Sequence, residues 1–124
     1  MPVIAITALP FAPSIDRPAV LTGLCEGLAE TCGLPLAHIS ATWRTLDAGC
    51  YCDAGVSAAT QPQRGHPVLV DVTCFDLTDD GRIQAILEFC GRYLETTLSL
   101  PGNVFVQYHC ARPGQVYAQG GIVD

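Results

Sequence analysis

The sequence predicts an α/β (α+β) fold in which one strand–helix–strand unit occurs twice within a single domain, residues 1–124. Three observations support this prediction. The opening segment PVI returns later as PVL, each copy precedes a stretch with helical spacing of apolar residues, and each stretch precedes a segment of alternating character. A shift of 65 residues brings both halves into one register. The predicted repeat units are residues 2–46 and 67–111, joined by a linker at 47–66.

The first element of each unit is predicted to be a strand. Residues 2–8 and 67–74 are short, apolar and rich in β-branched side chains, which is typical of buried strands. Asp71 is the exception within the second run, and we expect it to pair with an arginine. The linker carries the segment AGCYCDAG, for which we expect a short hairpin.

The second element of each unit is predicted to be a helix. Apolar residues recur at helical spacing from Leu21 to Cys32, Pro18 suits the first turn, and Gly33 ends the run. In the second half, TDDGR supplies a cap and an acidic first turn, and LPGN ends the helix. Cysteines on these apolar stripes are expected to pack in the core.

The third element of each unit alternates as a half-buried strand does. Ala41 and Trp43 point one way, while Ser40, Thr42 and Arg44 point the other; Phe105, Gln107 and His109 likewise share one side of the last strand. Two right-handed units would form a four-stranded mixed sheet with both helices on one face. The uncovered face is too large and too apolar to remain in water, so we expect a subunit interface there. The tail from Pro113 is expected to add a short strand that docks on a neighbour.

The composition excludes several function classes. The net charge is −6, with six arginines and no lysine, which disfavours binding to nucleic acid or to an anionic membrane. No apolar run approaches the length of a membrane span, and no secretory signal is visible at the start. Seven cysteines without disulfide-type spacing indicate reduced thiols, so we expect a cytoplasmic protein. The Cys50–Cys52 spacing does not suit a zinc site, and we expect neither a metal nor a cofactor.

Pro2 directly follows the initiator methionine and heads the first strand. Removal of Met1 would leave a secondary amine, whose ordinary pKa of about 8 falls when the charged form is desolvated. Such an amine can act as a general base at neutral pH, and the fixed φ of proline gives its nitrogen a defined direction.

Pro2 at the head of a duplicated β-α-β chain resembles the tautomerase superfamily, which includes 4-oxalocrotonate tautomerase, 5-carboxymethyl-2-hydroxymuconate isomerase and macrophage migration inhibitory factor. The segments GLPLAHI, DAGCYCDAG and NVFVQYHCARPGQVYAQGG are similar to parts of its members. The resemblance implies a homotrimer with active sites at the subunit boundaries and Pro2 as the catalytic base. It also implies substrate contacts for Gln107, Phe105 and Tyr51, which stand where relatives have asparagine, tyrosine and an aromatic residue.

The departures from the family concern the residues that bind carboxylates. Ser40 stands where the oxalocrotonate type has an arginine, Leu34 replaces a lysine, and DLTDD replaces the arginines of the dehalogenase and decarboxylase branches. A serine or leucine cannot make the bidentate pair of an arginine with a carboxylate. Arg44 and Arg112 are the candidate substitutes, and His109 is a candidate general acid.

The sequence therefore favours a cofactor-independent isomerase that interconverts the enol and keto forms of a small 2-oxo acid. Two alternatives remain open at this point. One is a hydrolytic dehalogenase or decarboxylase of a three-carbon acid. The other is a trimeric binding protein that has kept the fold and lost the substrate clamp.

Overall fold

A computed structural model describes residues 1–62 and 64–124; residue 63, within the predicted linker, lies outside the described residues. One four-stranded sheet has the order β2-β1-β5-β6, and two short hairpins stand apart from it. The elements in chain order are β1 (Val3–Ala8), α1 (Arg17–Cys32), the 3-10 turn η1 (Leu36–His38), β2 (Ser40–Thr45), β3 (Cys52–Asp53), β4 (Val56–Ser57), β5 (Val68–Phe75), α2 (Asp80–Thr97), β6 (Val104–Ala111), β7 (Val116–Ala118) and β8 (Gly121–Val123).

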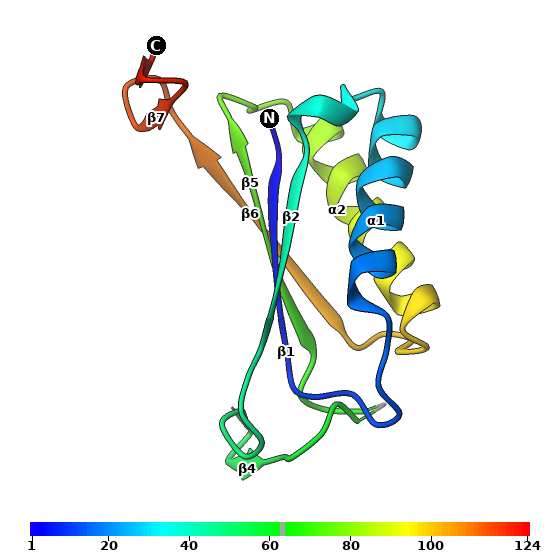
Figure 1. The fold of residues 1–124 in the computed structure, drawn as a ribbon. Helices are drawn as coiled ribbons and strands as arrows, with labels where there is room; N and C mark the ends of the chain where they lie inside the picture. Colours follow the sequence, from blue (N-terminus) through cyan, green and yellow to red (C-terminus); the bar gives the residue numbers. More distant parts are fainter. Residues whose placement is uncertain (63) are drawn as a thin grey trace.

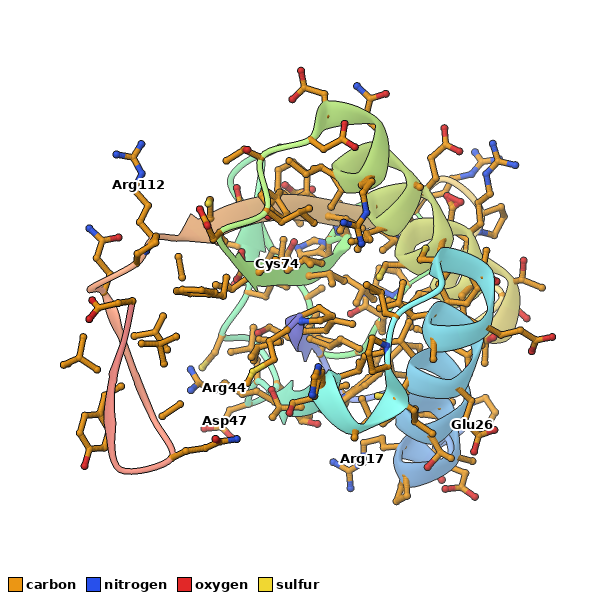
Figure 2. The ribbon with its side chains drawn as sticks, turned by 90° about the horizontal axis from the view of Figure 1, so that it is seen from above. Arg17, Glu26, Arg44, Asp47, Cys74 and Arg112 are labelled. Atoms are coloured by element: carbon orange, nitrogen blue, oxygen red, sulfur yellow. The ribbon has the colours of Figure 1, made fainter. Side chains whose placement is uncertain are left out.

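The sheet is mixed, as the sequence predicts. β1 runs parallel to β2, β5 runs parallel to β6, and the two central strands β1 and β5 pair antiparallel. Both helices cover one face of the sheet (Figure 1). The view along the strands shows the β7–β8 hairpin on the opposite side (Figure 2). A 65-residue shift carries Val3 of β1 onto Val68 of β5, the register used to predict the repeat.

Local signals set the ends of the helices. The Asp16 side chain accepts a hydrogen bond from the Ala19 N–H, so α1 begins at Arg17 and Pro18 lies in its first turn. Gly33 ends α1 with a left-handed φ of 64°. Asp79 caps α2 through the Gly81 N–H. That helix ends at Thr97, before the LPGN segment predicted to stop it, and Ser99 takes a left-handed φ of 54°.

The helices pack closely because glycines of α1 face aromatic rings of α2. A Cβ on Gly23 would clash with the Tyr93 hydroxyl, and a Cβ on Gly27 would clash with the Phe89 ring. The Tyr93 hydroxyl donates to the Val20 carbonyl at 2.9 Å. Neither helix of the described residues is long and apolar enough to cross a membrane.

Alternate residues of the strands form the core. The buried strand positions are Ile4, Ile6, Ala8, Val68, Val70, Val72 and Cys74, which pack against the buried helix positions Val20, Leu24, Leu28, Ile86, Cys90 and Leu94. The other side of the same strands is uncovered in the single chain, and Val3 and Phe105 there are 48% and 52% exposed. Asp71 and Gln107 face this side as well. We call it the open face. The burial patterns of β2 and β6 confirm the predicted split, with Ser40, Thr42, Arg44, Phe105, Gln107 and His109 on the exposed side.

The linker is anchored by a buried polar cluster at the end of the sheet where β5 and β6 begin. Gln61 accepts a hydrogen bond from the Leu9 N–H and donates one to the His66 carbonyl. His66 Nε2 lies within hydrogen-bond distance of the Val56 carbonyl oxygen, at 2.7 Å. The Asn103 side-chain amide donates to two linker carbonyls. The β3–β4 hairpin that these contacts hold confirms the predicted turn in AGCYCDAG.

The C-terminal segment forms a hairpin where the sequence predicts one short strand. β7 and β8 pair antiparallel with each other, and Tyr117 lies opposite Ile122. Both side chains are largely exposed, at 71% and 60%. The reason for the difference is local, because Gln119 and Gly120 adopt positive φ values and reverse the chain. The hairpin lies beyond the body of the sheet (Figure 1).

Candidate active site

Pro2 lies immediately before β1, at the end of the sheet where β5 and β6 finish (Figure 1). Its side chain is fully buried on the helix-covered side, next to the exposed Met1. The Pro2 carbonyl accepts a hydrogen bond from the Ser40 N–H at 3.1 Å, which continues the pairing of β1 with β2. Pro2 is therefore fixed by packing and by its carbonyl, while its nitrogen stands at the end of the strand.

Cys74 and Tyr108 lie on the covered side of the same end of the sheet. Burial raises the pKa of the Cys74 thiol, and the Tyr108 hydroxyl and the N-terminal ammonium act in the opposite direction. Burial also raises the pKa of Tyr108, whose hydroxyl donates to the Leu77 carbonyl at 2.7 Å. These are two largely apolar, protonated side chains at neutral pH. The covered side of this end of the sheet is therefore largely apolar.

Three predicted site residues share the Pro2 end of the molecule. Ser40 is the register partner of Val3 on one side. On the other side Val3 pairs with Thr73, which pairs in turn with His109, so all four residues form one row across the sheet. Arg112 follows the end of β6, and its backbone N–H donates to the Gln115 side chain. Its guanidinium points away from both layers (Figure 2). Within one chain, Ser40 is the predicted contact nearest to Pro2.

Gln107 lies at the centre of the open face. It is the register partner of Asp71, which in turn lies opposite Ala5 of β1. The Gln107 amide nitrogen donates to Asp71 Oδ1 at 2.9 Å, and His109 Nε2 lies 3.0 Å from the same oxygen. The expectation that Asp71 pairs with an arginine is therefore wrong, because its neighbours on β6 are a glutamine and a histidine.

Three other predicted residues lie at the opposite end. Arg44 and Phe105 fall in the row of Thr7, five residues along β1 from Pro2, which is roughly 17 Å at the usual rise per residue. Tyr51 lies beyond the ends of these strands, where its hydroxyl donates to the Pro67 carbonyl at 2.8 Å. Desolvation raises the pKa of Tyr51, with Asp53 acting in the same direction. These three side chains cannot reach Pro2 of their own chain.

The described residues hold no group of three or more histidine, cysteine or acidic side chains placed for a metal ion. Cys50 and Cys52 are exposed on the β3–β4 side of the molecule, and all seven cysteines are free thiols. Cys90 lies within the core, where burial raises its pKa to about 12, so its thiol stays protonated.

The pairing of Asp71 with Gln107 and His109 was not predicted from the sequence, although a signal for it exists. Valines flank it at positions 70 and 72, so strand alternation alone turns it away from the core. The parallel pairing of β5 with β6 then places it opposite Gln107. This pairing follows from the repeat, because β1 and β2 of the first unit pair in the same parallel way.

No family model matches the chain, and no curated protein matches it in sequence. Solved structures do match its fold over nearly its whole length. Pt0534 inactivated by 2-oxo-3-pentynoate aligns with a TM-score of 0.80 at 17% identity, covering 98% of this chain and 94% of that one. The chain has the tautomerase-superfamily fold.

Two further solved structures align with the chain over nearly its whole length. A fused 4-OT described as a symmetric trimer aligns with a TM-score of 0.77 at 17% identity, covering 98% of this chain and 94% of that one. N1, a member of the cis-3-chloroacrylic acid dehalogenase family, aligns at 0.76 and 20% identity, covering 98% and 83%. The predicted resemblance to the tautomerase superfamily is confirmed at the level of the fold.

Proposed function

We propose that the protein is a cofactor-independent tautomerase that interconverts the enol and keto forms of a small 2-oxo acid, with Pro2 as its general base after removal of Met1. The observation that supports this most directly is the position of Pro2. It heads the first strand of a tautomerase-superfamily fold, and its ring is fully buried. The substrate class agrees with the compound that inactivates the similar protein Pt0534, which is itself a 2-oxo acid.

The proposed assembly is a homotrimer in which each site forms between subunits. The open face leaves apolar side chains such as Val3 and Phe105 about half exposed in the single chain. The predicted substrate contacts lie at two ends of the molecule, so Phe105, Tyr51 and Arg44 would serve a neighbour's Pro2 rather than their own. A symmetric interface repeats every such contact in all subunits. The trimeric fused 4-OT supports this arrangement.

The proposed reaction moves one proton. The neutral Pro2 nitrogen takes the proton of the enol hydroxyl, and the electrons of that O–H bond stay on oxygen as an enolate, where they form the carbonyl as the double bond to carbon opens. The electrons of the carbon–carbon double bond then take the same proton from the Pro2 ammonium, which regenerates the neutral amine. Hydrogen-bond donors near the substrate oxygen stabilise the charge that develops there. Gln107 and His109 would supply them, and Arg112, Ser40 or Arg44 would meet the substrate carboxylate.

The similarity to N1 supports a second candidate, hydrolytic dehalogenation of a three-carbon acid. In that reaction Pro2 would activate water, and the halide would leave with its electron pair. The family's arginines for such substrates are replaced here by DLTDD, which favours the tautomerase. Release of chloride from a haloacrylate at a rate above that of enol ketonisation would reverse this preference.

The test is a comparison of two identical substitutions. Pro2→Ala removes the cyclic secondary amine, whereas Pro67→Ala changes the residue that occupies the same place in the second repeat. We expect Pro2→Ala to lower kcat for ketonisation of a small enol by at least about a hundredfold, since general base catalysis contributes that much. Pro67→Ala should leave kcat unchanged. Mass spectrometry of the purified chain must also show loss of Met1. Equal activity of both variants, or a retained Met1 in active protein, would contradict the proposed role of Pro2.

A further inference from the structure

Asp71 is a carboxylate at the centre of the open face, on the central strand β5. Its register neighbours are Ala5 on one side and Gln107 on the other, and its side chain is 48% exposed. The surrounding strand positions are mainly apolar or small, so a carboxylate here is not a usual surface charge. Its contacts explain why it is there.

One oxygen of Asp71 serves two partners. Oδ1 accepts from Gln107 Nε2 at 2.9 Å, directly across the β5–β6 pair, and lies 3.0 Å from Nε2 of His109, one side-chain pair further along. The hydrogen bond from Gln107 holds the pKa of Asp71 below its ordinary value, and that from His109 acts in the same direction against a small effect of desolvation. Asp71 is therefore ionised at neutral pH and can only accept hydrogen bonds.

Because Asp71 can only accept hydrogen bonds, both of its partners must donate to it. Gln107 must turn its NH2 group toward Asp71, which leaves its carbonyl oxygen and its second N–H for other contacts. His109 must carry a proton on Nε2, so Nδ1 is the free ring nitrogen. The charge of the carboxylate strengthens both hydrogen bonds. One aspartate thus determines the orientation of two side chains that the proposed function places near the substrate oxygen.

We propose that Asp71 is a positioning residue of the active site, which holds the Gln107 amide and the Nδ1 edge of His109 toward the enol oxygen of the substrate. This inference rests on the proposed tautomerase function. When the ring is protonated, His109 Nδ1 donates to the negative charge that develops on the substrate oxygen as Pro2 takes the enol proton. The remaining N–H of Gln107 donates to the same oxygen or to the adjacent carboxylate. Asp71 itself does not touch the substrate.

The first test reads the His109 ring without any assay of activity. Long-range ¹H–¹⁵N spectra of the purified, labelled protein distinguish the two neutral tautomers of each histidine. We expect His109 to show the pure Nε2–H form, whereas the exposed His38 should show an averaged mixture. Asp71→Leu, which keeps the size and removes the acceptor, should make His109 resemble His38. Averaged signals for His109 in the wild type, or no change in the variant, would overturn the proposal.

The second test asks whether Asp71 acts through its two partners. We expect Asp71→Leu to lower kcat for enol ketonisation about tenfold, as the loss of a charge-assisted hydrogen bond does, with KM changed much less. In a chain that carries Gln107→Leu and His109→Gln, the same substitution should change kcat by less than about twofold. A full tenfold loss in that background would show that Asp71 acts by another route. Asp71→Glu should restore part of the activity, because it keeps the carboxylate.

The matched control is Glu26→Gln, which removes one negative charge from α1, on the far side of the helix layer (Figure 2). We expect it to change neither the His109 tautomer nor kcat. If the wild-type protein shows no activity on any enol of a 2-oxo acid, the proposed function fails. The tautomer spectra would still decide whether Asp71 orients His109, so the two failures can be told apart.

Discussion

The two faces of the central sheet are made by the same strands and differ in almost every other respect. Ile4 and Ile6 of β1 are no more than 1% exposed beneath the helices, while their neighbour Val3 is 48% exposed on the other side. The covered face contains aliphatic side chains and buried thiols. The open face combines apolar residues with Arg44, Asp71, Gln107 and His109. The covered face accounts for the stability of the single chain, and the open face holds the groups that can recognise a partner or a substrate.

This contrast supports the proposal that the active site forms between subunits. Pro2 is fixed from the covered side, where its ring is buried, but the residues expected to touch its substrate lie on the open face. Phe105 and Arg44 are roughly 17 Å along the strands from Pro2. A neighbouring subunit packed on the open face would bring such residues to Pro2. In this view, assembly and catalysis depend on the same surface.

The largest effect is expected from a charge at the centre of the open face. Ala5→Arg places a long guanidinium side chain in the row of Asp71 in every subunit, and forcing it into a packed interface costs several kcal/mol of desolvation even where it pairs with Asp71. We expect sedimentation analysis to show a folded monomer without activity. Ala85→Arg, on the exposed side of α2, is the control and should leave the oligomer intact. An Ala5→Arg protein that remains trimeric would show that the open face is not the interface.

Adjacent residues of β1 provide the next comparison. Ile6 is 1% exposed in the core, and its replacement by alanine should lower the free energy of unfolding by about 2–5 kcal/mol. Thr7, one residue later, faces the open side, and Thr7→Ala should cost less than about 1 kcal/mol. Urea unfolding at a fixed protein concentration measures both, since subunit association makes stability depend on concentration. Equal losses would mean that the interface contributes as much stability per residue as the core.

Much of this architecture could be predicted because its signals are local. Pro18 and Gly33 mark the ends of α1, and the alternation in β2 and β6 assigns each residue to a face. The 65-residue register then relates the two halves. Even so, the tail differs from prediction, because two positive-φ residues at its turn make a hairpin rather than a single strand.

The contacts that could not be predicted join residues far apart in sequence through side chains. Gln61 bonds to Leu9 across 52 residues, and Asp71 bonds to His109 across 38. Such contacts depend on the exact register of strands and on loop geometry, which neither composition nor periodicity specifies. The division of the candidate site between two ends of the molecule could not be predicted for the same reason. A single sequence carries no direct record of which surfaces meet in an assembly.

The smallest predicted effect concerns acid stability on the open face. The pKa of Asp71 is lower in the folded state than in the unfolded chain, so the folded state favours its carboxylate form. Its contribution to stability is therefore complete above the unfolded pKa, near 4, and is lost as the pH falls through the lower folded-state value. Because the side chain is half exposed, we expect less than about 1 kcal/mol. Wild type and Asp71→Asn should accordingly differ in urea midpoint at pH 6 and converge near pH 2. A difference that persists at pH 2 would mean that Asp71 stabilises the fold by packing rather than by accepting the Gln107 and His109 hydrogen bonds as an ion.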